Sequence, residues 1–244
     1  MNSSVFPVCW WRTGVRDRIG APEPYVVMAV DPGNAESLDT LLVVPMPHDY
    51  EAAIGAAVAL RLDLRKPDLL LSGNGIDRLL LARTDTPRVR VLDTTGRTIR
   101  WVPAGGPGRR YTRAEQAQIR QAADSSSRGG FAAGVAAGVR VRGDGRPMPT
   151  VPALEVEVLV PEQAPALTAL VAGDRFLLVG RGDHLQRDGI VNWDILGYDG
   201  RRLGDVRLPP RMQLFALRRD WLYAVQKDEL DVESVLILQL SPPR

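Results

Sequence analysis

The stretch Asp68-Leu69-Leu70-Leu71-Ser72-Gly73-Asn74-Gly75-Ile76-Asp77-Arg78-Leu79-Leu80-Leu81-Ala82 contains two short apolar runs on either side of an Asn-Gly pair. Asparagine and glycine both tolerate a positive φ, which tight hairpin turns require. Short apolar runs bounded by turn residues are typical of strands rather than helices. The stretch therefore predicts a β-hairpin.

Two further runs follow this hairpin. Val89 to Asp93 is followed by the turn Thr94 to Arg97, and Thr98 to Val102 comes next. Four short strands joined by tight turns predict an antiparallel meander, the unit from which a β-propeller blade is built.

The same pattern occurs twice more downstream. In the second copy, Asp174-Arg175-Phe176-Leu177-Leu178 aligns with Asp77-Arg78-Leu79-Leu80-Leu81, and Ile195-Leu196 with Gly200-Arg201 aligns with Val91-Leu92 and Gly96-Arg97. The third copy has only three runs: Gln213 to Leu217, Trp221 to Val225 and Val235 to Leu240. Repetition at this scale predicts an all-β, β-propeller-like array of four-stranded meanders, and the pattern leaves open whether the array closes.

The predicted organisation has two parts. Residues 1–24 carry scattered Gly and Pro and are expected to form an irregular lead-in, and residues 25–244 to form the propeller-like domain. Residues 103–150 interrupt the repeats as an insertion. There Thr112 and Glu115 form a capping box, which predicts a short helix from Arg113 to about Ala123. A mobile segment is expected after it, from Phe131 to Pro149, whereas Tyr50 to Leu64 fits either a helix or a strand.

Composition excludes several functional classes. The 244 residues carry 31 Lys and Arg against 29 Asp and Glu, so a net charge of +2 gives no reason to expect a nucleic acid or a membrane surface as partner. No apolar run approaches the ~18 residues that a membrane helix needs. Cys9 is the single cysteine, which excludes an internal disulfide and a thiolate metal site.

The chain shows little sign of catalytic chemistry. His48 and His184 are its two histidines, and the common metalloprotease, esterase and nucleotide-binding motifs are absent. We predict no catalytic residue and no cofactor. Four carboxylates, those of Asp228, Glu229, Asp231 and Glu233, are weak candidates for a Ca²⁺ site, although a charged turn at the edge of a sheet explains them more simply.

Three further features have simple explanations. Trp193 and Trp221 occupy strand positions, where packing between sheets is expected, whereas Trp10 and Trp11 in the lead-in are candidates for a contact surface. Arg181-Gly182-Asp183 spells an adhesion tripeptide, but so short a match arises easily by chance.

Three segments carry a family resemblance: Trp193 to Pro209, Asp220 to Glu233 and Arg88 to Arg97. They resemble bacterial six-bladed β-propeller proteins of the NHL-repeat and TolB-like type. The resemblance implies the fold but little chemistry. It also implies an extracytoplasmic compartment, although this chain shows no signal peptide, and further blades before its amino end, where the sequence is shorter than its relatives.

Three functional hypotheses remain. The first is a non-enzymatic binding or scaffold module whose loops, at one end of the array, contact an unknown protein or small molecule. The second is a metal-dependent lactonase or esterase-like hydrolase, for which Asn74, Asn192 and Asp220 are available ligands, although they share no repeat position. The third is an incomplete gene product without activity of its own.

Overall fold

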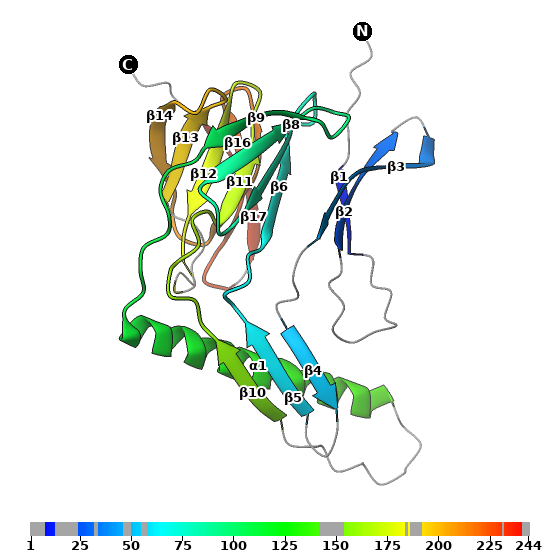
Figure 1. Cartoon of the computed structure of the whole chain (residues 1–244), viewed down its shortest axis with the longest axis vertical. Helices are drawn as coiled ribbons and strands as arrows, with labels where there is room; N and C mark the ends of the chain where they lie inside the picture. Colours follow the sequence, from blue (N-terminus) through cyan, green and yellow to red (C-terminus); the bar gives the residue numbers. More distant parts are fainter. Residues whose placement is uncertain are drawn as a thin grey trace.

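The described part of the protein is mostly β, with one helix (Figure 1). The computed structural model describes residues 8–12, 24–31, 34–45, 50–54, 58–141, 154–183, 185, 192–230 and 232–240. These form five small sheets of three or four strands. The prediction of a mostly β chain built from antiparallel meanders is confirmed.

The hairpin predicted from the Asn-Gly pair opens a four-stranded sheet. Its strands are β6 (Leu69–Gly73), β7 (Leu79–Arg83), β8 (Arg88–Leu92) and β9 (Thr98–Pro103), paired in sequence order and antiparallel throughout. Gly75 adopts φ 68° in the first turn and Gly96 adopts φ 78° in the last, which explains glycine at both positions.

The second copy of the pattern forms an equivalent sheet. Its strands are β11 (Ala169–Ala172), β12 (Phe176–Arg181), β13 (Asn192–Gly197) and β14 (Arg202–Arg207). A β-bulge lies between Val91 and Leu92 in the first sheet and between Ile195 and Leu196 in the second. The two sheets therefore share even this bulge, at residues that the sequence alignment pairs with each other.

The alignment of the second strands is wrong by one residue. In the first sheet Leu79 pairs with Leu92. In the second sheet the residue that pairs with Leu196, the counterpart of Leu92, is Leu177, whereas the alignment matched Leu79 with Phe176. Both strands are runs of apolar residues, so their sequence does not mark which side chain faces which neighbour.

The third copy forms a three-stranded sheet, as predicted. It contains β15 (Met212–Arg218), β16 (Trp221–Lys227) and β17 (Glu233–Gln239). A two-residue turn joins β15 to β16, with Arg219 at φ 53°. No described strand pairs with the outer edge of β17.

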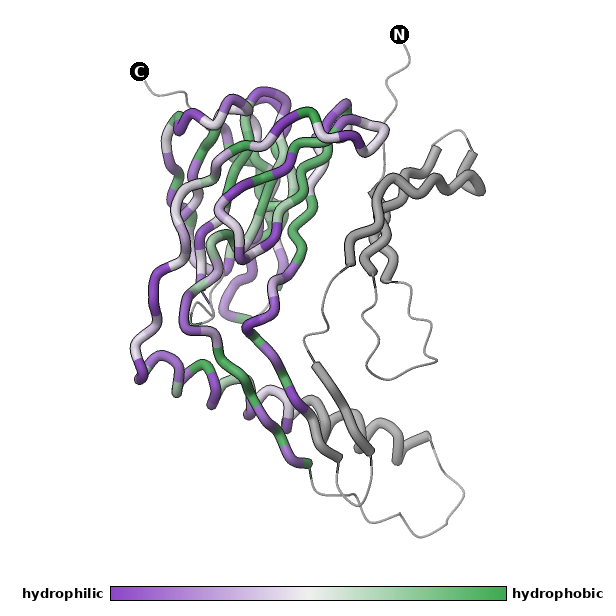
Figure 2. Tube along the Cα trace, viewed as in Figure 1, coloured by the Kyte–Doolittle hydropathy of each residue, from purple (hydrophilic) through white to green (hydrophobic). Residues whose placement is uncertain are grey.

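These three sheets stack face to face through two apolar cores. Between β6–β9 and β11–β14 the core contains Leu80, Val91, Leu177 and Val179, at most 2% exposed. Between β11–β14 and β15–β17 it contains Leu178, Trp193, Leu217 and Leu222. The central sheet β11–β14 is thus covered on both faces, and Figure 2 shows the apolar segments running through the stacked strands.

The first strands of the three sheets lie next to one another. β11 contacts both β6 and β15, and Ala172 N of β11 donates a hydrogen bond to Ser72 Oγ of β6 (2.9 Å). The three sheets are therefore joined along their first strands, and the described strands do not form a closed ring.

The insertion differs most from expectation. Helix α1 runs from Arg113 to Val141, far past the predicted end near Ala123, and most of the expected mobile segment is helical. The serine and glycine residues at 125–130 do not end it. Arg128 pairs with Asp124 one turn earlier in the helix, a spacing that supports helical structure, and Ser127 Oγ donates to the Ala123 carbonyl.

Helix α1 packs on a separate three-stranded sheet of order β10-β5-β4. The strands are β4 (Tyr50–Ile54), β5 (Val58–Asp63) and β10 (Leu154–Leu159). In the ambiguous segment 50–64, residues 50–54 and 58–63 are therefore strand. β10 pairs with β5 in parallel, a departure from the all-antiparallel expectation that brings together segments about 95 residues apart.

The amino-terminal part contains a fifth sheet. Strand β1 (Val8–Arg12) pairs with β2 (Pro24–Asp31), which pairs with β3 (Asn34–Pro45). The expected irregular lead-in thus includes a strand, which holds Trp10 and Trp11. Whether the chain divides into domains as predicted stays a prediction.

Candidate functional site

Three hairpin turns meet at one end of the stack. They join β6 to β7, β11 to β12 and β15 to β16. Arg219 N, in the third turn, donates to Asp174 Oδ2 in the second (3.3 Å). Arg218, the last residue of β15, reaches the first turn, because a Cβ on Gly75 would lie 2.5 Å from its Nη2. We call these three turns, with Tyr198, the hairpin cluster.

Asn74 organises the first turn of the hairpin cluster. Its Oδ1 accepts hydrogen bonds from the backbone N–H groups of Ile76, Asp77 and Arg78 at 3.0–3.1 Å. Its Nδ2 donates to Asp77 Oδ1 (2.9 Å). The side chain is 3% exposed and its amide oxygen is saturated, so Asn74 has a structural role and no lone pair free for a metal.

Tyr198 links the first sheet to the second. Its hydroxyl donates to the Gly173 carbonyl (2.7 Å), and the Arg78 guanidinium lies 4.3 Å from its ring centroid. Burial raises the pKa of Tyr198 to about 12, against the opposing charge of Arg78. The phenol is therefore neutral over the physiological range.

The hairpin cluster carries more positive than negative charge. It contains four guanidinium groups, those of Arg78, Arg175, Arg218 and Arg219, and three carboxylates, those of Asp77, Asp174 and Asp220. Asp77 is bound to Asn74, and Asp174 accepts from Arg219 N while its Oδ1 is buried without a partner. Arg175 and Arg219 are exposed and form no ion pair with any described residue.

A second polar network holds the start of α1 against the stack. Arg109 pairs with Glu115 and with Asp183, both at 2.8 Å, and Glu115 also accepts from Thr112 N (2.8 Å). The capping box predicted from the sequence is therefore present, with Thr112 Oγ1 accepting from Glu115 N (3.2 Å). The Arg109 guanidinium, followed by the backbone of Thr112, lowers the pKa of Glu115 to about 2.

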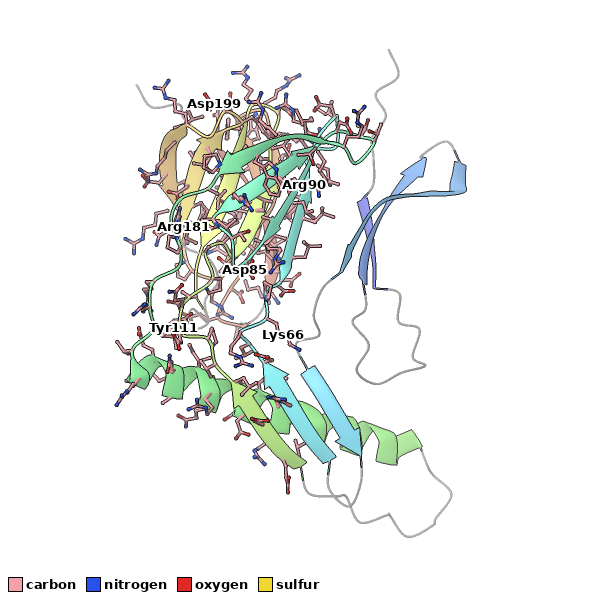
Figure 3. All side chains as sticks on the ribbon, in the orientation of Figure 1. Lys66, Asp85, Arg90, Tyr111, Arg181 and Asp199 are labelled. Carbon is pink, nitrogen blue, oxygen red and sulfur yellow. The ribbon has the colours of Figure 1, made fainter. Side chains whose placement is uncertain are left out.

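The Arg181-Gly182-Asp183 tripeptide belongs to the same structural framework. Arg181 Nη2 donates to the Ala104 carbonyl (2.8 Å) and its Nε pairs with Asp194, while Asp183 accepts from Arg109. Both charged side chains are thus used within the chain. Figure 3 shows Arg181 on the sheets and Tyr111 near the start of α1, whereas Asp199 lies at the opposite end of the stack.

The structure describes three of the four weak metal candidates, Asp228, Glu229 and Glu233. Asp228 Oδ1 accepts from Leu230 N and Val232 N at 2.8 and 2.9 Å and so shapes its own turn. Glu233 pairs with Lys227 (3.0 Å), Glu229 is exposed, and Asp231 lies outside the described residues. In the part of the chain that the structure describes, no three His, Cys, Asp or Glu side chains are grouped to hold a metal ion.

The other candidates have different outcomes. Asn74 and Asp220 both lie in the hairpin cluster, but Asn192 begins β13 at the other end of its sheet. Trp193 is 2% exposed and packs between sheets as predicted, whereas Trp221 is 42% exposed, so the prediction is wrong for it. His48 and His184 lie outside the described residues.

Comparisons with known proteins give no family assignment. No protein-family model matches the chain, and no curated protein matches its sequence. Among the described residues, no helix is both long and apolar enough to cross a membrane.

The sequence predicted the three turns but not their convergence. The signal for Tyr198 and Arg78 was present in part, because each stands at a predicted turn, Arg78 between the first two strands of its sheet and Tyr198 between the last two of its own. Their contact depends on how one sheet lies on the next, which the repeat does not encode.

Proposed function

We propose that the sheets β6–β9, β11–β14 and β15–β17 are consecutive blades of a β-propeller-like array, and that the chain is a non-enzymatic binding module. Three observations support this arrangement: the bulge lies at the same position in the first two sheets, the first strands lie next to one another, and the three turns of the hairpin cluster converge. The proposed contact surface is the hairpin cluster.

The observation that carries the binding proposal is the net positive charge of the hairpin cluster. Asp77 is bound to Asn74 and lies 3.7 Å from Arg78, and Asp174 accepts from Arg219 N, whereas Arg175 and Arg219 are exposed and form no ion pair with any described residue. The hydrogen bond from Arg219 N to Asp174 places these two arginines on adjacent turns. Two neighbouring guanidinium groups are suited to bind carboxylates, each with a fork of N–H donors.

The partner we propose is an acidic segment of a protein. Attraction of this kind is salt-dependent, because both arginines are exposed to solvent. The balanced overall charge of the chain argues that the attraction is local to this cluster.

The experiment uses a fluorescently labelled oligo-glutamate peptide as the probe. We expect weak binding that decreases steeply with added salt, and at least about tenfold weaker binding by the R175E/R219E variant. The matched control, R113E/R120E, makes the same charge change at two exposed arginines of α1.

The control variant should bind within about twofold of the unmodified chain. The proposal fails if the peptide does not bind at low salt, or if both variants lose binding equally. Equal loss would mean that the peptide responds to net charge rather than to the hairpin cluster.

A further inference from the structure

The third stacked sheet has one covered and one uncovered face. Leu222 and Ala224 of β16 are 1% and 0% exposed and pack towards β11–β14. Side chains on a strand alternate between faces, so their neighbours in sequence point the other way. The exposed apolar side chains of this sheet are Phe215 at 54%, Trp221 at 42%, Val235 at 69% and Ile237 at 58%.

These residues form one continuous surface, which we call the outer face. Pairing places Tyr223 opposite Ile237 and Val225 opposite Val235, and the Phe215 and Tyr223 rings lie 6.4 Å apart. Strands that are apolar on both sides are typical of sheets buried on both faces. An exposed patch of this kind marks an interaction surface.

We propose that the outer face binds the outer face of a second copy of this chain, related to the first by a two-fold axis. The sheet already packs its inner face on β11–β14, and a partner on the other side must likewise offer a flat apolar sheet face. A second copy supplies such a face, and a surface that pairs with itself closes as a dimer.

The exposed area is sufficient for a weak dimer. The four exposed side chains leave roughly 400 Å² of apolar surface on each copy, so a pair covers roughly 800 Å². Since about 60% of a typical interface is apolar, the total is roughly 1,300 Å², within the lower range of specific interfaces. We therefore expect a dissociation constant on the order of 10–100 µM.

The test is analytical ultracentrifugation of the full chain from about 1 µM to several hundred µM. The mass should rise with concentration from 26.7 kDa towards twice that value. Ile237→Lys should weaken association at least about tenfold. The matched control is Ile99→Lys, because Ile99 is 51% exposed on β9, away from the outer face, and its change should have no effect.

A second measurement applies even if Ile237→Lys does not fold. In a Cys9→Ser background, Tyr223→Cys places one thiol at the centre of the outer face, and mild oxidation should give a disulfide-linked dimer. Ile99→Cys should not.

A mass of one chain at every concentration would overturn the proposal, including the case in which another segment of the same chain covers the outer face. So would association that Ile237→Lys leaves unchanged. Peptide binding by the hairpin cluster is measured separately, so either proposal can fail without the other.

Discussion

The sheets β11–β14 and β15–β17 have similarly apolar strands but different surroundings. Phe176-Leu177-Leu178-Val179 in β12 is covered on both faces, whereas Trp221-Leu222-Tyr223-Ala224-Val225 in β16 is covered on one. The composition of a strand thus indicates that both faces of its sheet should be buried, but it does not show what buries them. The contrast determines which substitutions should be costly.

The largest effects are expected in the central sheet. Leu177 and Leu178 are both fully buried, one against each neighbouring sheet. Leu177→Ala and Leu178→Ala should each lower the free energy of unfolding by about 2 to 5 kcal/mol, through lost burial and a residual cavity. Urea denaturation checks this, with the exposed Leu203→Ala as control. A small loss at either position would mean that one face of the sheet is not packed.

In β15–β17, substitutions on the inner and outer faces should lower the free energy of unfolding by different amounts. Leu222→Ala should also cost about 2 to 5 kcal/mol, whereas Val235→Ala, at a residue 69% exposed, should cost less than about 0.5 kcal/mol. Both are measured in dilute protein, where a dimer is not populated. Equal losses would contradict the assignment of inner and outer faces.

The first turn of the hairpin cluster should depend on one amide. Asn74→Ala removes the acceptor of three backbone N–H groups and should cost about 2 to 3 kcal/mol by urea denaturation. Asn192→Ala, at an exposed asparagine in β13, is the matched control and should be nearly neutral. Similar values for the two variants would show that the turn does not need this side chain.

Tyr198 should give a smaller, pH-dependent effect. Tyr198→Phe removes the hydrogen bond to Gly173 and should cost about 1 kcal/mol near neutral pH. The folded pKa of about 12 lies above the ordinary value of 10, so the unfolded chain loses its proton first as the pH rises. The contribution of Tyr198 is therefore complete below pH 10 and is lost between pH 10 and 12.

The measurement is the free energy of unfolding of both proteins at pH 9 and at pH 11. The difference between them should shrink at the higher pH. A difference that is constant with pH would contradict a buried, neutral phenol.

The smallest effect is expected at the start of α1. Arg109→Ala should raise the pKa of Glu115 from about 2 towards the ordinary 4.5, since the guanidinium is the main cause of the shift. Titration of the Glu115 side chain by NMR checks this. The site is solvent-exposed, so unfolding at neutral pH should change little. An unchanged Glu115 pKa would mean that Thr112, and not Arg109, dominates.

Local sequence signals predicted most of the stacked sheets. The Asn-Gly pair, the glycines of the later turns and the capping box at Thr112 each appear where expected, because their effects act over a few residues. The three described strands of the third copy also match the three runs predicted from its sequence.

Long-range features could not be predicted in this way. The parallel pairing of β5 with β10 and the extension of α1 to Val141 both depend on contacts between distant segments. The one-residue error in β12 has the same origin, since Phe176 and Leu177 are equally apolar. The hairpin cluster requires the packing of three sheets, which no turn specifies by itself.

The central claim is that the three turns of the hairpin cluster converge at one end of the stack. Paramagnetic relaxation measured by NMR tests this most directly. A nitroxide attached at Asp77→Cys in a Cys9→Ser background should broaden the amide signals of Gly173, Asp174 and Arg219, which lie on two other sheets. Signals of β10 and α1 should keep their intensity. If Gly173, Asp174 and Arg219 remain sharp, the three sheets are not arranged with their first strands side by side.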